Sequence, residues 1–204
     1  MTITIGVSAV LGVSLFTLLS ASEIQVRDLR LAVGIGPSLT AFGGLEIDAG
    51  IARDGSLCWS GANIYTHGGF AWAAGLAMAH GESNLLTIAP AELSYRRIGP
   101  VGRFAYAYAF TRSIHMEAGV FASIGFLNVR TRYHSDGSDN SSGGVYAAIG
   151  PLVAIYAEAG AGIVIGLEVE YRSEVGSVVS YDSGPTGGTQ AKGVAARLAA
   201  GYRF

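Results

Sequence analysis

The stretch that decides the fold is KGVAARLAAGYRF, residues 192–204. From Val194 onward its even-numbered positions are apolar and end in Tyr202 and Phe204, whereas its odd-numbered positions are small or cationic and include Arg197 and Arg203. Successive side chains of a β-strand point to opposite faces, so this pattern predicts a two-faced strand. An apolar face that ends in aromatics, opposite a face that carries arginine, is typical of strands that separate lipid from the lumen of a membrane barrel.

The final eight residues, RLAAGYRF, resemble the C-terminal assembly signal of bacterial outer-membrane barrels. That signal has a polar residue, a glycine two places on, an aromatic or apolar residue third from the end and a terminal aromatic. Arg197, Tyr202 and Phe204 match it, while Ala199 stands at the glycine position. The resemblance implies insertion by the barrel assembly machinery into the outer membrane of a Gram-negative-type cell.

The composition agrees with a membrane barrel and excludes several other classes of protein. Half of the residues are hydrophobic, 14% are charged, and glycine occurs 30 times, which is unlike an ordinary soluble domain. The net charge of −2 gives no field that would attract nucleic acid. The single cysteine, Cys58, excludes an internal disulfide, and we interpret it as an inert thiol in a loop. We find no spacing of metal ligands and no cofactor motif.

The N-terminal segment has the features of a secretory signal peptide. Residues 1–22 carry no charge, and a mostly apolar run over residues 7–19 precedes the small residues 20–22. We therefore predict a signal peptide over residues 1–22, cleaved after residue 21 or 22, and a barrel domain over residues 23–204. The alternatives are a retained membrane anchor, a first strand or a mis-set start of the sequence.

Alternating side chains recur along the rest of the chain and predict an all-β fold, a transmembrane antiparallel β-barrel. We expect eight strands, or ten if residues 27–52 form a hairpin rather than one kinked strand. A row of aromatics at Phe104, Tyr106, Tyr108 and Phe110 is expected to face lipid. Residues 53–61 read as a polar loop, residues 98–100 as a break, and a phase slip after Leu127 as a β-bulge. The predicted strands cover residues 27–52, 62–80, 85–97, 102–110, 116–133, 145–155, 163–171 and 192–204.

Taken together, the strand pattern is similar to that of the small eight-stranded outer-membrane family typified by outer-membrane protein A and its adhesin-like relatives. The roles within that family diverge, so the resemblance implies an architecture and a compartment rather than an activity.

A bundle of transmembrane helices is the competing architecture. Residues 55–81 and 140–157 contain no Asp, Glu, Lys or Arg, and each is long enough to cross a bilayer as a helix. However, charges recur at every second residue at Glu168, Glu170 and Arg172. On a helix this spacing would scatter charge into lipid, whereas on a strand the three side chains share one wet face, which favours the barrel.

The barrel interpretation points a set of charged side chains into the lumen, where they are expected to pair. Glu168 and Glu170 are expected to meet Arg197 on the next strand, with Arg30 in reach. Mixed signs favour a salt-bridged plug, because a selective pore usually has rings of one sign. The predicted lumen charges are Arg30, Glu46, Asp48, Glu92, Arg96, Glu117, Glu168, Glu170, Arg172, Arg197 and Arg203.

The predicted function is that of a non-enzymatic outer-membrane barrel with a structural, surface-interaction or narrow-pore role. Its partners are expected to be outer-membrane lipid, the assembly machinery and surface ligands bound by loops 133–144 and 173–190. A lipid-modifying enzyme is the alternative, with His115, Glu117 and either Ser113 or Ser123 as the candidate catalytic groups. An i, i+2, i+4 row extends over roughly 13 Å, which is long for a compact triad.

Overall fold

The computed structural model describes residues 24–47, 50–65, 67–85, 91–135, 137–181 and 186–204. The predicted signal peptide, residues 1–22, and the predicted lumen residue Asp48 lie outside the described residues. Within the described part, no helix is long and apolar enough to cross a membrane. The two segments weighed as transmembrane helices are extended instead. Apart from His67, which lies in a turn, their described residues belong to the strands Ile51–Tyr65, Gly68–Leu85 and Asp139–Glu158.

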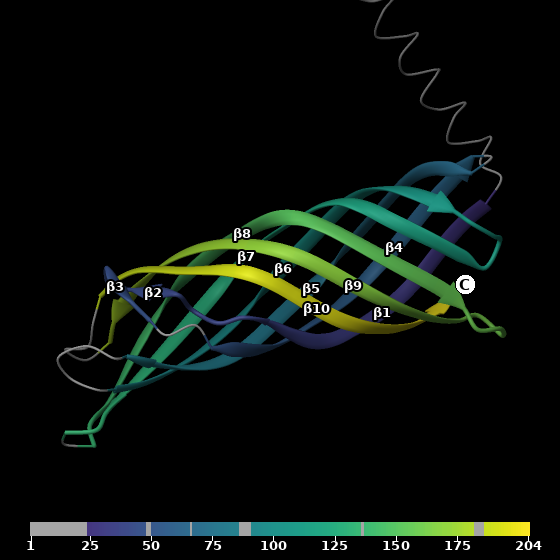
Figure 1. The fold of residues 1–204 in the computed structure, drawn as a ribbon. Helices are drawn as coiled ribbons and strands as arrows, with labels where there is room; N and C mark the ends of the chain where they lie inside the picture. Colours follow the sequence, from purple (N-terminus) through teal and green to yellow (C-terminus); the bar gives the residue numbers. More distant parts are fainter. Residues whose placement is uncertain (1–23, 48–49, 66, 86–90, 136, 182–185) are drawn as a thin grey trace, which may run out of the picture.

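The described residues form a closed ring of eight long antiparallel strands, as predicted (Figure 1). Neighbours along the chain pair with each other, and the first strand pairs with the last from Asp28↔Arg203 to Ile35↔Ala196, which closes the ring. The ring strands are β1 (Ile24–Pro37), β4 (Ile51–Tyr65), β5 (Gly68–Leu85), β6 (Ala91–Ala109), β7 (Ile114–Tyr133), β8 (Asp139–Glu158), β9 (Ile163–Ser180) and β10 (Gly187–Arg203).

The segment between β1 and β4 differs from both predicted alternatives. Two very short strands, β2 (Ala41–Phe42) and β3 (Leu45–Glu46), pair with each other, and β2 also pairs with Thr189 and Gln190 of β10. Pro37 ends β1, where its missing N–H costs no ladder hydrogen bond. This small hairpin lies at the end of the barrel opposite the C-terminus (Figure 1).

The two ends of the barrel differ in their connections. At the end that carries the C-terminus, residues 110–113 join β6 to β7 and residues 159–162 join β8 to β9. At the other end lie the hairpin β2–β3 and the connection of residues 181–186 between β9 and β10. Membrane barrels have shorter turns on the periplasmic side, so we call the C-terminal end the periplasmic end and the opposite one the outer end.

The outer surface of the ring is apolar. The predicted aromatic row points outward, with Phe104 59% and Tyr106 60% exposed, and Trp59, Leu57 and Leu167 are exposed on other strands. A soluble protein would bury such side chains, whereas a barrel presents them to lipid. The prediction that this row faces outward is therefore confirmed.

Residues 53–61, predicted as a polar loop, are part of β4. They pair with β1 on one side and with β5 on the other over their whole length. Asp54-Gly55 and Ser60-Gly61 are typical of turns, but a complete ladder of hydrogen bonds on both sides outweighs that local preference. Cys58 is consequently not in a loop; it is buried on the lumen face.

The break predicted at residues 98–100 is also absent, because β6 continues through Pro100. Pairing with β7 resumes from Ile98↔Phe126 to Val101↔Ser123 with no change of register. Pro100 faces outward, and the ladder tolerates one missing N–H there. The predicted strands 85–97 and 102–110 thus form mainly one strand, while the predicted strand 62–80 is divided between β4 and β5.

The bulge predicted after Leu127 is wrong, and the reason is informative. In β7 every odd-numbered residue from His115 to Thr131 is buried or half-buried, and the register with β6 is constant across Leu127. The strand register therefore stays constant at Leu127, and what changes is the type of side chain on each face. Toward the outer end, Leu127 and Val129 point inward, and Asn128 points outward.

The two predicted long loops are mostly strand. β8 begins at Asp139, β9 extends to Ser180, and β10 begins at Gly187. The connections that replace the two predicted loops are therefore limited to residues 134–138 and 181–186.

Candidate functional site

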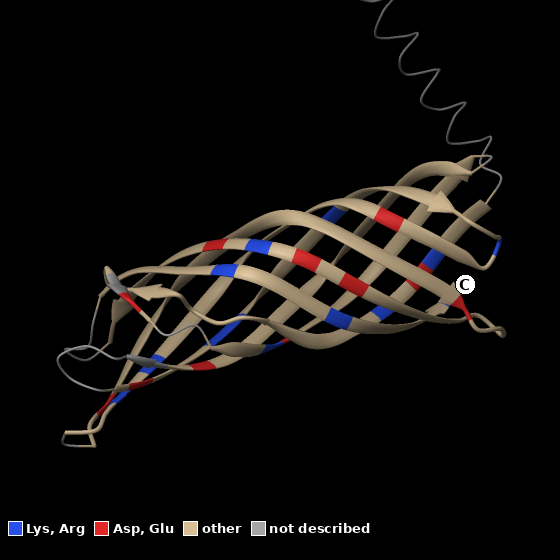
Figure 2. Cartoon of the chain, in the orientation of Figure 1, with Lys and Arg blue, Asp and Glu red and all other residues tan. Residues whose placement is uncertain are grey.

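The lumen of the barrel contains a network of buried charges contributed by six of the eight ring strands, whereas β5 and β8 face the lumen with uncharged residues such as Ala71, Ala73 and Tyr156. Each of these acids and arginines is at most 5% exposed, and Figure 2 shows red and blue positions distributed along the wall. The buried charges are Asp28, Arg30, Asp54, Arg97, Arg103, Glu117, Glu168, Glu170, Arg172, Glu174 and Arg197.

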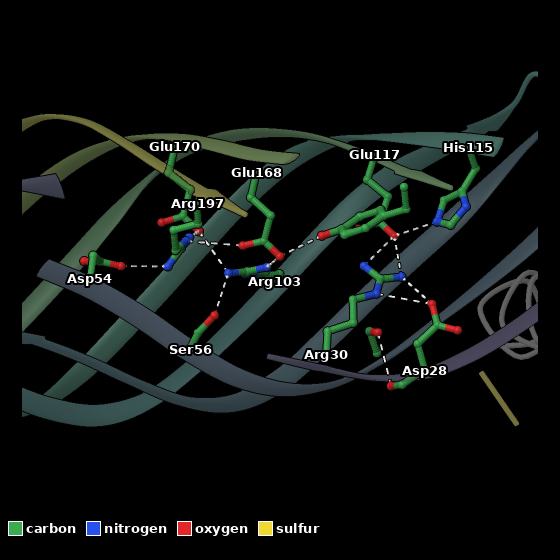
Figure 3. A network of polar contacts seen from close by, with 12 residues as sticks. Asp28, Arg30, Asp54, Ser56, Arg103, His115, Glu117, Glu168, Glu170 and Arg197 are labelled. Atoms are coloured by element: carbon green, nitrogen blue, oxygen red, sulfur yellow. Dashed lines mark hydrogen bonds and ion pairs between the residues drawn. The ribbon is translucent and has the colours of Figure 1, made fainter. Parts of the chain in front are cut away.

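Asp54 is the centre of the largest cluster. Its carboxylate accepts hydrogen bonds from Arg97 at 2.9 Å and from Arg197 at 3.0 Å, and it also contacts Arg172. These arginines come from β6, β10 and β9, so one side chain of β4 links strands from around the ring. Figure 3 shows Asp54 and Arg197 pointing toward each other within the lumen.

A second group of contacts continues this cluster toward the periplasmic end. Arg103 donates to Glu168 at 2.9 Å and to Ser56 at 3.3 Å, and its Nη2 lies 3.2 Å from Glu170 (Figure 3). The hydroxyl of Tyr156 donates to the same carboxylate oxygen of Glu168 at 2.9 Å.

A third group lies near the periplasmic end. Arg30 donates to Asp28 at 2.9 Å and to Glu117 at 3.1 Å, and His115 Nε2 lies 3.2 Å from Glu117 (Figure 3). Arg203 bridges Asp28 at 3.0 Å and Glu158 at 2.6 Å. Every one of these charges therefore has at least one partner of opposite sign.

Aromatic rings fill the space beside the ion pairs. The guanidinium of Arg30 stacks 3.7 Å from the centroid of the Tyr156 ring, and that of Arg172 lies 5.6 Å from Phe121. The cavity left between Asp54, Arg97, Arg172 and neighbouring residues is about 10 Å³, which is the room that a single water needs. At this level the lumen is packed.

Seven of the eleven predicted lumen charges face the lumen in the structure. Arg197 contacts Glu170 and lies 3.3 Å from Glu168, as expected, whereas Arg30 pairs with Asp28 and Glu117 instead of joining that cluster. The predicted residues that face the lumen are Arg30, Glu117, Glu168, Glu170, Arg172, Arg197 and Arg203.

Three predicted lumen residues are exposed instead. Glu92 and Arg96 point outward from β6, and Glu46 lies in the hairpin β2–β3. The prediction assumed that polar residues face inward along the whole of every strand. Near the outer end the strands carry apolar residues such as Leu93 and Tyr95 on the lumen face, so the polar ones face out, as in a water-soluble sheet.

Five members of the network were missed by the sequence analysis. Arg103 alternates with the aromatic row that was expected to face lipid, and Asp28 has the same parity as Arg30. Asp54 was hidden in the supposed loop. Parity along a continuous strand is the signal that would have found all of them, and the missed residues are Asp28, Asp54, Arg97, Arg103 and Glu174.

The candidate catalytic groups are only partly together. His115 and Glu117 are adjacent and buried, but Ser113 is exposed in the turn, where its N–H donates to Thr111. The hydroxyl of Ser123 donates to the carbonyl of Pro100 at 2.9 Å. Among the described residues, no group of three His, Cys, Asp or Glu side chains is arranged to hold a metal.

The closed ring, its outward apolar surface and its charged lumen decide the class of protein. The chain is a transmembrane β-barrel. Tyr202 and Phe204 of the predicted assembly signal point outward with their rings 5.6 Å apart, whereas Arg197 points into the lumen. Recognition of this barrel's C-terminus by the assembly machinery remains a prediction.

Comparison with known proteins gives distant structural likenesses. No protein-family model and no curated protein matches the chain. The attachment invasion locus protein Ail of Yersinia pestis is similar at 10% identity and a TM-score of 0.39, over 89% of this chain and 99% of that one. Neisserial surface protein A is similar at 8% identity and 0.36, over 88% and 96%. The CymD monoaromatic hydrocarbon channel is similar at 8% identity and 0.28, over 92% and 90%. At these values the likeness carries no argument about function.

Proposed function

We propose that this barrel is a non-enzymatic outer-membrane protein with a closed lumen, which acts structurally and through its outer surface rather than as a pore. The packed charge network is the observation that supports the proposal. Carboxylates and arginines pair with each other throughout the lumen. An ion-selective pore would instead need a ring of charges of one sign and an open cross-section. The residual cavity of about 10 Å³ leaves no continuous path for a hydrated ion at this level.

The position of the candidate catalytic groups supports the same proposal. His115 and Glu117 are 3% and 5% exposed, and they lie inside the lumen rather than on the lipid-facing wall. A lipid substrate would need these groups and a serine nucleophile to meet at one accessible place. We expect the lipid of the outer membrane and the barrel assembly machinery to be the partners that every such barrel needs.

Conductance across a planar bilayer tests the closed lumen. We expect the chain from residue 23 onward, refolded in detergent and inserted, to give no single-channel steps. The double variant Arg172→Ala/Arg197→Ala removes two guanidinium groups from the middle of the lumen and is expected to conduct. Heat-dependent migration on a gel would first establish that this variant folds.

The matched control is Arg130→Ala/Arg132→Ala, which removes two arginines from the outer face of β7 and is expected to stay closed. Stepwise conductance of the unaltered protein would refute the closed lumen and establish a narrow pore instead.

A further inference from the structure

A row of basic side chains crosses the outer wall of the barrel near its outer end. Arg53 of β4 is the cross-strand partner of His80 in β5, and His80 is the partner of Arg96 in β6. Both arginines are exposed on the outer face, and Asn128 of β7 continues the row. Because neighbouring strands are about 4.8 Å apart, the backbones of Arg53 and Arg96 are only about 10 Å apart.

On β5, β6 and β7 this row lies at the level where the outer face changes from apolar to polar, whereas on β4 the exposed Ile51 lies beyond Arg53. One outward position nearer the periplasmic end, β5, β6 and β7 carry Met78, Ile98 and Phe126, all of them exposed. One outward position farther toward the outer end, they carry Glu82, Ser94 and Arg130. The change from lipid-facing to water-facing side chains marks the headgroup region of the outer leaflet.

The two arginines of the row have no acidic partner among the described residues. This separates them from Arg130, which pairs with Asp139 at 2.6 Å. His80 is better satisfied, since its Nδ1 lies 3.1 Å from the carbonyl of Tyr95 and its Nε2 lies 3.6 Å from Glu82. The unpaired positive charge of the row therefore comes from Arg53 and Arg96.

A groove on the outer wall joins this row to the apolar band. It has a volume of about 790 Å³, and both arginines and His80 line it together with Met78, Ile98 and other apolar side chains. Gly55 and Gly143 also line it, and their cross-strand partners, Met78 and Val179, have larger side chains. The groove thus combines a cationic rim with an apolar floor in the order that an anionic lipid presents its headgroup and acyl chain.

We propose that this groove binds a phosphate-bearing lipid of the outer leaflet, with the phosphate between Arg53 and Arg96 and an acyl chain along Met78 and Ile98. Arginine binds phosphate oxygens in pairs through parallel N–H groups, which suits two guanidinium groups that flank one headgroup. The proposal depends on the outward face of the barrel and not on whether the lumen is closed, so the conductance test and the test below fail independently.

Native mass spectrometry of the detergent-refolded chain from residue 23 onward tests this site. The probe is diphosphorylated lipid A, and its dephosphorylated form and phosphatidylcholine serve as the comparison lipids. We expect one phosphorylated lipid to remain bound, with the dephosphorylated form much weaker. Near a lipid surface each arginine contributes about a factor of five in affinity for an anionic lipid, so Arg53→Gln/Arg96→Gln is expected to weaken binding about 30-fold.

The matched control is Arg130→Gln/Arg132→Gln, which removes the same charge from the same outer face farther from the apolar band and is expected to leave binding within about a factor of three. Equal weakening by the two double variants would overturn the site, because it would indicate general attraction of anions. Equal binding of the dephosphorylated lipid, or displacement of the lipid by millimolar inorganic phosphate alone, would overturn the assignment to a phosphorylated lipid.

Discussion

The substitution Asp54→Asn tests the lumen network most directly. Asp54 is the acceptor shared by Arg97, Arg172 and Arg197, and its side chain is only 1% exposed. Asparagine has nearly the same shape and keeps one acceptor oxygen, but it removes the negative charge at the point where three buried guanidinium groups converge. We expect the barrel to fold and to lose about 3 kcal/mol of its free energy of unfolding.

The magnitude follows from the contacts that remain. Removing one partner of a buried ion pair typically costs about 3–5 kcal/mol, because the other charge is left uncompensated. Here none of the three guanidinium groups is left alone, which places the cost at the lower end of that range. The remaining contacts are Arg97 with Glu174, Arg172 with Glu170, and Arg197 with Glu168 and Glu170.

Equilibrium unfolding by urea in lipid vesicles, followed by tryptophan fluorescence, measures this loss. With a dependence on urea of about 2 kcal/mol per molar, the midpoint is expected to fall by about 1.5 M. The matched control is Asp139→Asn, which breaks an exposed pair with Arg130 and is expected to cost less than about 1 kcal/mol. If the two variants shift the midpoint equally, the assignment of Asp54 as the buried centre of the network is wrong.

Three further outcomes are expected. A Cβ at Gly166 would lie 2.3 Å from the ring of Tyr156, so Gly166→Val is expected to displace this ring and to destabilise the barrel by about 1–3 kcal/mol, measured by the same urea titration. Tyr156→Phe keeps the ring but loses the 2.9 Å hydrogen bond to Glu168, and the midpoint should reveal a cost of about 1–3 kcal/mol; an unchanged midpoint would show that this bond adds nothing. Trp59 is 60% exposed on the wall, and its ring centroid lies 6.5 Å from that of Trp72, so acyl chains brominated at varied depth are expected to quench this fluorescence strongly; quenching by aqueous acrylamide alone would contradict the outward orientation.

The barrel was predictable because apolar and polar side chains alternate along each membrane-spanning strand. This alternation can be recognised in the sequence of a single strand. The final strand and the aromatic row at Phe104 and Tyr106 were correctly oriented, since an apolar face toward lipid admits no exception within the bilayer. The boundaries of the strands were harder to predict from the sequence. Asp54-Gly55 and Pro100 carry local signals for a turn or a break, and only the pairing partners on both sides show that the strand continues.

The partners within the lumen could not be predicted from the sequence for a different reason. The alternation of side chains predicts that Arg30 and Glu117 point inward. However, these two residues are 87 positions apart in the sequence, and their strands β1 and β7 are not neighbours in the ring. Such contacts depend on the diameter of the barrel and on the stagger of its strands, which no local pattern contains. The expectation that succeeded, Arg197 with Glu168, joins paired neighbours on adjacent strands.

The inversion of side-chain chemistry along β6 and β7 locates the membrane. It occurs between Ile98 and Arg96 on one strand and between Phe126 and Asn128 on the other, and Arg96 and Asn128 are cross-strand partners. Unrelated local irregularities would not coincide in this way, whereas a planar boundary between lipid and water requires it.

The length of the apolar stripe agrees with that boundary. The outward stripe from Met116 to Phe126 spans ten residue steps of about 3.3 Å. At a strand tilt of roughly 40° its height is about 25 Å, which is the height of the lipid-facing band of an outer-membrane barrel. Beyond it the strands continue into water and bury Leu93, Tyr95 and Val129 inside the ring. Strands β5, β6 and β7 thus follow two rules in succession: charges are paired inside an apolar wall within the membrane, and an apolar core lies inside a polar wall outside it.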